Sequence, residues 1–241
     1  MTAAPGGNWS IERRTDSARD LHAPWPAPGE RGRRTVGLCM VVGAPTLVLG
    51  SAQDEDVVDA ARAARSGVEV ARRASGGGAV LVGPGAQVWV DVWVPRHDEL
   101  WDEDVVRSSW WLGEVWTSAL ERLGARGLAV HRRRATRTEW SDVVCFAGLG
   151  PGEVTSGTAK VVGVAQRRTR EGARLHSVAP LSWEPAELLT LLALDDEQVR
   201  DAHRTLDDVA TGIRAVVVPL RDVDAKVVIA TVEDAVLATL P

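Results

Sequence analysis

A strict alternation of side chains makes residues 87–94 the clearest strand in this chain. In the sequence QVWVDVWV, four valines share one face, whereas glutamine, aspartate and two tryptophans share the other. A repeat of two residues is the side-chain period of a β-strand, not of a helix. The fold of this chain must therefore contain a β-sheet that includes this segment.

Shorter β-branched runs and helical patterns surround this strand. We expect further strands at 35–42, 46–49, 68–71, 79–82, 143–147, 159–164 and 174–178. We expect helices at 9–20, 54–66, 104–123, 185–193, 196–210 and 222–240. Strands cluster in the first three quarters and helices at the end. This order favours an α+β fold with a mixed β-sheet flanked by helices over regular βαβ repetition.

The chain length of 241 residues suits one large domain, or one domain with a small appendage. Residues 1–30 are rich in proline, glycine and charge, which predicts a peripheral N-terminal lead-in. The main domain is expected at 31–185, and 186–241 would be its C-terminal helical part.

Composition excludes several classes of protein. A net charge of −5 gives no basic footprint for nucleic acid. There is no apolar run long enough for a membrane span, and the N-terminus lacks the pattern of a secretory signal. The two cysteines, Cys39 and Cys145, are too few for a disulfide framework. Together these features predict a cytoplasmic protein with reduced thiols.

The segment 71–80, ARRASGGGAV, carries the strongest local signal for chemistry. Gly76, Gly77 and Gly78 lie between two strand-like runs, where the backbone can approach a ligand closely and its N–H groups can bind an anion. Arg72 and Arg73 precede them and offer bidentate partners for a carboxylate or phosphate. The alternative is a flexible hairpin with surface arginines. No Gly-Lys-Ser/Thr follows, and a strand rather than a helix comes next, so neither common nucleotide-binding loop fits.

Three segments together resemble the lipoate–protein ligase A and octanoyltransferase family. ARRASGGGAV resembles the family signature R-R-x-S-G-G-G-A-V, and 157–167, GTAKVVGVAQR, resembles G-x-K-x-x-G-S-A-Q-R. Upstream, 47–53, LVLGSAQ, resembles the strand that precedes the signature. The motifs occur in the family's order across roughly 35–180. The resemblance implies the biotin/lipoate ligase-like, class II synthetase-like catalytic domain.

The resemblance also implies an activity and a set of site residues. In the ligases, lipoate or octanoate reacts with ATP and Mg²⁺ to form an acyl-adenylate. A lysine of a lipoyl-acceptor domain, in a 2-oxoacid dehydrogenase or a glycine cleavage protein, then attacks the acyl carbon. Lys160, one of only two lysines in the chain, matches the motif lysine that contacts the acyl carbonyl and phosphate; a solvated strand-end lysine is the alternative. The expected binding residues are Arg73, Ser75, Gly76, Gly77, Gly78 and Gly163.

Cys145 opens a second hypothesis. The pair Cys145-Phe146 resembles one found in octanoyltransferases, where the thiol carries the octanoyl group as a thioester. That enzyme takes the acyl group from octanoyl-acyl carrier protein and needs no ATP. Lys160 and Arg73 nearby would activate a thiolate electrostatically. A small buried strand residue is the alternative role for this cysteine.

Three positions depart from the family pattern and motivate a third hypothesis. Val82-Gly83 stands where the family has His-Asp, Val164 where it has serine, and His176-Ser177 where it has His-Gly. A non-catalytic member that binds an acyl group or a partner would tolerate such changes. His97, His131 and His176 lack metal-ligand spacing, so no metal site is expected.

Overall fold

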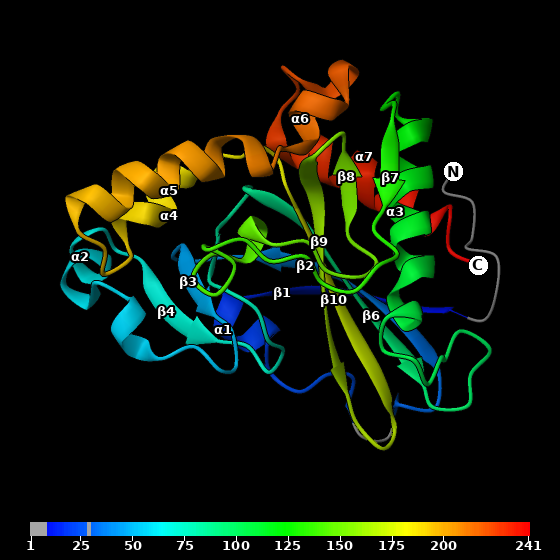
Figure 1. Cartoon of the computed structure of the whole chain (residues 1–241). Coiled ribbons are helices and arrows are strands. Elements are labelled where there is room, and N and C mark those ends of the chain that lie inside the picture. Colours follow the sequence, from blue (N-terminus) through cyan, green and yellow to red (C-terminus); the bar gives the residue numbers. More distant parts are fainter. Residues whose placement is uncertain (1–8, 28–29) are drawn as a thin grey trace.

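The computed structural model describes residues 9–27 and 30–241, and its largest element is a seven-stranded mixed sheet (Figure 1). The strands follow the order β1-β2-β6-β10-β9-β8-β7. Only the β1–β2 pair is parallel within this sheet; the other neighbouring pairs are antiparallel. Their bounds are β1 Trp9–Asp16, β2 Arg34–Val41, β6 Gln87–Pro95, β7 Leu128–Val130, β8 Val154–Ser156, β9 Ala159–Arg168 and β10 Gly172–Pro180.

A smaller sheet of three strands carries the glycine triplet. Its order is β4-β3-β5, with β3 at Thr46–Leu49, β4 at Glu69–Arg72 and β5 at Val80–Val82. The glycines form the connection from β4 to β5. Leucines of β3 pack in one buried cluster with residues of α4 (Pro185–Thr190) and α5 (Asp196–Val209), which lie over this part of the molecule (Figure 1).

The strand β6 pairs with β2 and β10 along its two edges, and apolar clusters cover both of its faces. Its valines pack with α3 (Trp110–Arg122) and α7 (Ala225–Leu237) in the main core. On the opposite face, Trp89 packs with Leu21 and Val48. The predicted alternation of 87–94 is confirmed, and each of its two faces joins a different apolar cluster.

The remaining elements are short. They are α1 Ala18–Leu21, α2 Ala60–Arg65, α6 Ile213–Val216, and the 3₁₀ turns η2 Glu55–Val57, η3 Arg107–Ser109, η4 Cys145–Ala147 and η5 Val218–Leu220. No helix in the described part of the chain has the length and apolar character needed to cross a membrane.

The α+β prediction is confirmed, but several predicted elements are wrong or divided. Residues 9–16 form β1 rather than a helix, because all eight of them pair with β2, and a short helix follows only at 18–21. Residues 143–147 form no strand: a single bridge at Val144 is followed directly by η4. The helix expected at 54–66 is divided, because Asp59 caps a new helix by accepting a hydrogen bond from the amide of Arg62.

The domain boundaries at residues 30 and 185 remain predictions. Of the expected lead-in, residues 1–8 and 28–29 lie outside the described part of the chain. Within the described part, β1 adds an edge strand to the larger sheet.

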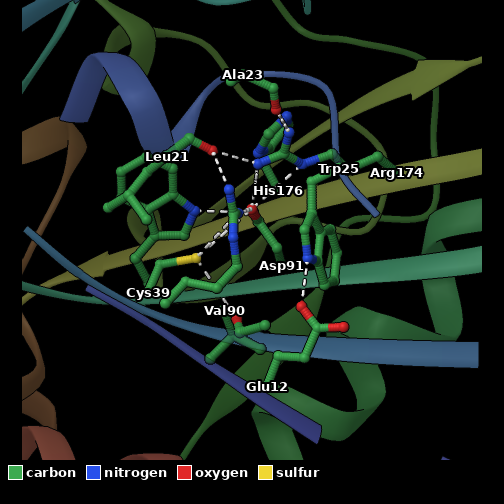
Figure 2. Close-up of polar contacts among 12 residues, drawn as sticks. Glu12, Leu21, Ala23, Trp25, Cys39, Val90, Asp91, Arg174 and His176 are labelled. Carbon is green, nitrogen blue, oxygen red and sulfur yellow. Dashed lines mark hydrogen bonds and ion pairs between the residues drawn. The ribbon is translucent and has the colours of Figure 1, made fainter. Parts of the chain in front are cut away.

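A buried carboxylate joins β1, β6 and β10 (Figure 2). Asp91 of β6 is fully buried. Its Oδ2 accepts hydrogen bonds from Arg14 Nη1 at 3.2 Å and from Arg174 Nη2 at 2.5 Å. Its Oδ1 accepts one from Trp89 Nε1 at 2.8 Å and lies 2.8 Å from His176 Nδ1. A charge removed from water needs such partners, because an unpaired buried carboxylate is strongly destabilising.

The same cluster fixes α1 to the sheet. Arg174 also donates hydrogen bonds to the carbonyl oxygens of Leu21 and Ala23 (Figure 2). Burial acts to raise the pKa of Asp91, but its interactions with His176 and with the Arg174 guanidinium outweigh burial and hold that pKa below its usual range. The carboxylate therefore stays ionised in the folded protein.

His22 lies beside this cluster in a neutral state. Its ring is 4.7 Å from that of Trp89 and 5.3 Å from that of His176, measured between centroids. Burial, reinforced by the nearby His176, lowers the pKa of His22 to about 2. The folded protein therefore takes up no proton at His22 between pH 7 and 5, whereas the unfolded chain does.

Stability should fall as the pH drops through the ordinary pKa of histidine. Below pH 6.5 the unfolded state binds one more proton at His22, which lowers the free energy of unfolding by roughly 1.4 kcal/mol per pH unit. We expect His22 to account for about 2 kcal/mol of the loss between pH 6.5 and 5. Urea unfolding at pH 7 and pH 5 measures the decline, and His22→Phe should remove this part of it.

A matched control is His97→Asn. His97 is exposed and has a φ of 72°, a conformation that asparagine tolerates. This variant should keep the full pH dependence of the parent chain. An equal decline in His22→Phe and the parent would contradict the assignment to His22.

Candidate functional site

A cavity of about 710 Å³ brings together most of the residues that the sequence singled out. Gly76, Gly77, Gly78, Cys145 and Lys160 line it. Five of the eight predicted site residues therefore face one space, whereas Arg73, Ser75 and Gly163 lie outside its lining. Its volume falls within the range typical of small-molecule sites. Further lining residues include Gln53, Ser109, Thr136, Glu153 and Gln166.

Backbone pairing holds the glycine triplet against the cysteine segment. Ala79 N donates to the carbonyl of Val143 at 2.8 Å, and Cys145 N donates to the carbonyl of Ala79 at 2.9 Å. A Cβ atom on Gly78 would lie 2.6 Å from backbone atoms of Val144. Gly78 therefore lacks a side chain for a packing reason, and Gly77 for a conformational one, since its φ is +98°.

Arg73 supports the glycine loop from behind. Its guanidinium donates to the carbonyl oxygens of Val48, Gly76 and Gly78 at 3.2, 2.8 and 2.8 Å, and the residue is buried. All of these acceptors are backbone atoms of the protein. The geometry thus gives Arg73 the role of holding the loop in shape, and its expected role in binding a ligand remains a prediction.

Ser75 and Gly163 lie outside the cavity lining but contact residues of the site. Ser75 is buried, its carbonyl accepts a hydrogen bond from Ser51 N, and its Oγ has no hydrogen-bond partner among the described residues. A Cβ atom on Gly163 would lie 3.3 Å from Lys160 Cε and 3.4 Å from Phe146 Cζ. Glycine at 163 therefore leaves room for the lysine side chain.

Lys160 is a buried cation, which excludes the solvated strand-end lysine. It is 2% exposed, and its Nζ lies 2.7 Å from Glu153 Oε1. The same nitrogen donates to the carbonyl oxygens of Cys145 at 3.0 Å and Gly148 at 3.1 Å. It also lies 4.7 Å from the centroid of the Phe146 ring. These contacts place the ammonium at the wall of the cavity.

Glu153 is a site residue that the sequence analysis missed. It is 4% exposed, and besides Lys160 it accepts hydrogen bonds from Gly150 N at 2.6 Å and Val164 N at 3.1 Å. It immediately precedes β8, which pairs with β9, the strand of Lys160. The only sign of this contact in the sequence was an acidic residue a few positions before the motif lysine, at the spacing of a hairpin.

Cys145 is partly exposed and begins the turn η4. Lys160, which the sequence predicted to lie near the thiol, donates a hydrogen bond to the backbone carbonyl of Cys145. Arg73, the second expected activator, is bound to loop carbonyls. Cys39, the other cysteine, lies in the Asp91 cluster, where burial raises the pKa of its thiol.

The three positions that depart from the family pattern have different surroundings. Val164 lines the cavity and donates its amide to Glu153. Val82 and Gly83 line a second cavity, of about 410 Å³, whose wall includes Phe146. Ser177, which stands where the family has glycine, is buried and its hydroxyl donates to the carbonyl of Val90 at 2.6 Å. Among residues 9–27 and 30–241, no group of three or more His, Cys, Asp and Glu side chains is placed to hold a metal ion.

Comparison with known proteins agrees with this geometry. The family model described as "Lipoyl protein ligase A/B catalytic domain" matches residues 30–240. No curated protein matches the chain.

Solved structures of low sequence identity share the fold. A bipartite lipoate protein ligase from Thermoplasma acidophilum, solved in a study that includes its E2 lipoyl domain, superposes with a TM-score of 0.68 at 16% identity, over 96% of this chain and 82% of that one. A lipoate-protein ligase A bound with ATP has a TM-score of 0.55 at 16% identity, over 91% and 96%. A T. acidophilum protein described as a lipoate protein ligase, with bound lipoic acid, has a TM-score of 0.57 at 17% identity, over 90% and 95%.

Because of the close approach at Gly78, we expect alanine substitutions at two neighbouring glycines to differ in their effect on stability. Gly78→Ala would force a methyl group against the backbone of Val144, and overpacking of this kind costs about 1–3 kcal/mol. We expect the Tm to fall by at least about 2 °C. In Gly76→Ala the new Cβ meets no atom within 4 Å, so this control should unfold close to the parent temperature. Thermal unfolding followed by circular dichroism measures both; equal Tm values would refute the close approach.

Proposed function

The chain belongs to the lipoyl protein ligase A/B catalytic domain family, and we propose that it attaches a lipoyl or octanoyl group to a lysine of a lipoyl-acceptor domain after activating it with ATP. The observation that carries the proposal is the cavity, since its wall includes both the glycine triplet and the ammonium of Lys160. The relatives solved with lipoic acid, with ATP and alongside an E2 lipoyl domain support it.

The cavity provides the groups that this reaction needs. A carboxylate oxygen of the acid attacks the α-phosphorus of ATP and pyrophosphate leaves; the acceptor amine then attacks the acyl carbon and AMP leaves. Negative charge grows on phosphate oxygens in the first step, and on the acyl carbonyl oxygen and the departing phosphate in the second. The backbone N–H groups of Gly76–Gly78 and the cation of Lys160 would stabilise that charge. Mg²⁺ would be held chiefly by the phosphates of ATP, as is usual for this ion.

A second candidate is ATP-independent octanoyl transfer through Cys145. The observation that favours it is that Cys145, partly exposed, lines the same cavity as Lys160. The Cys145 thiolate would attack the thioester of octanoyl-acyl carrier protein and release the carrier thiol. The acceptor lysine would then attack the new thioester and regenerate Cys145.

Intact-mass analysis of an apo lipoyl domain tests the proposal. One arm contains lipoate, ATP and Mg²⁺, and the other contains octanoyl-acyl carrier protein without ATP. We expect a mass gain in the ATP arm, reduced roughly 100-fold or more in Lys160→Met because the cation facing the developing charge is lost. No pyrophosphate release and no mass gain in the ATP arm would refute the ligase.

The two cysteines separate the second candidate from the first. If Cys145 carries the acyl group, Cys145→Ala abolishes transfer from octanoyl-acyl carrier protein, and the parent accumulates a thioester on the peptide that contains Cys145. Cys39→Ala is the control, because Cys39 is buried in the Asp91 cluster outside the cavity lining. Full transfer by Cys145→Ala in that arm would exclude the thioester route.

A further inference from the structure

Three protein oxygens surround the Lys160 ammonium. A lysine ammonium has three donors and no acceptor. Here it donates hydrogen bonds to the carbonyl oxygens of Cys145 at 3.0 Å and Gly148 at 3.1 Å, and it forms an ion pair with Glu153 Oε1 at 2.7 Å. An acyl or phosphate oxygen that binds Lys160 must therefore compete with these partners.

The three partners are not equivalent. Glu153 carries the negative charge that compensates the Lys160 cation, which is only 2% exposed. Removing the counter-charge of a buried ion costs much more free energy than exchanging a neutral partner. The carboxylate is itself fixed by the amides of Gly150 and Val164, which come from different segments. The two carbonyls are neutral and belong to η4 and the residue that follows it. A ligand oxygen would thus replace a carbonyl, not the carboxylate.

The stem of the lysine is confined on its other sides. Gly163 and Phe146 border it, and Phe146 stacks on Trp183 with ring centroids 5.2 Å apart. The backbone of Lys160 is also held, because its carbonyl accepts a hydrogen bond from Thr211 N at 2.9 Å. Only the position of the terminal ammonium is left to be set by a polar partner.

We propose that Glu153 is the positioning residue of this site. It holds the ammonium of Lys160 at the cavity wall, so that a ligand oxygen replaces the carbonyl of Cys145 or Gly148 while the cation stays in place. Glu153 acts through Lys160 and does not contact the reacting atoms. This inference rests on the proposed acyl transfer for the identity of the ligand oxygen.

A double-mutant cycle on acyl transfer tests the role. Glu153→Gln should lower kcat at least about tenfold with KM for the acyl donor within about threefold, because a misplaced cation mainly weakens transition-state contacts. Glu153→Asp should restore part of kcat. In a Lys160→Met background, adding Glu153→Gln should cause no further loss, since the residue through which it acts is already gone.

Glu233→Gln is the matched control. Glu233 is 5% exposed and pairs with Arg13, so it is a buried, ion-paired glutamate outside the cavity lining. Its variant should keep the parent kcat. A further tenfold loss from Glu153→Gln in the Lys160→Met background, or an equal loss of kcat in Glu233→Gln, would overturn the positioning role and leave a general effect on folding.

A readout without transfer separates failure of this inference from failure of the proposed function. Because Lys160 binds the carbonyl of Cys145, displacing its ammonium should change the rate at which iodoacetamide alkylates Cys145. Lys160→Met, Glu153→Gln and the double variant should shift that rate, measured by peptide mass, in the same direction and to within about twofold of one another. If the parent transfers no acyl group but these shifts agree, the proposed function fails and Glu153 still positions Lys160. A parent-like rate in Glu153→Gln overturns the inference.

Discussion

A single backbone pairing, between Ala79 and Val144, assembles the cavity. The hydrogen bonds on either side of this bridge place the glycine triplet and Cys145 at the same wall, although they lie far apart in the sequence. The pairing brings two main chains so close that only glycine fits at position 78. Arg73 then fixes the loop through its carbonyls, which leaves the glycine backbone facing the cavity.

The Asp91 cluster performs a corresponding function for the sheet. It places one carboxylate at the centre of β6 and surrounds it with cations from β1 and β10, so that three strands share one set of ionic contacts. Such a cluster is sensitive to the loss of any partner, because the remaining charges stay buried. Ser177, the residue after His176 that departs from the family motif, donates to the carbonyl of Val90 and is not part of the cavity lining, so this departure lies outside the proposed reaction space.

Local sequence patterns predicted most of the longer strands and the glycine loop, because both depend on short-range periodicity and on backbone freedom, but they missed the short strands β7 and β8. They did not predict β1, whose residues are largely charged and become a strand only by pairing with β2. They did not predict Glu153 either, because its importance arises from a side-chain contact across the β8–β9 hairpin. The sequence singled out Arg73, but the direction of its guanidinium depends on carbonyl oxygens of the glycine loop and of the neighbouring strand β3. Contacts made in three dimensions account for each of these differences.

The burial of Lys160 also limits which side-chain amines of this chain an activated acyl group could modify. An activated acyl group reacts with accessible amines, and this chain has only two lysines. One is enclosed and engaged by three oxygens, which leaves Lys226, exposed on α7, as the other side-chain amine. Arginine replaces lysine at nearly every other basic position and cannot accept an acyl group under these conditions. If the proposed reaction takes place, so small a number of lysine amines would protect the chain from its own activated substrate and would leave the acceptor domain as the main target.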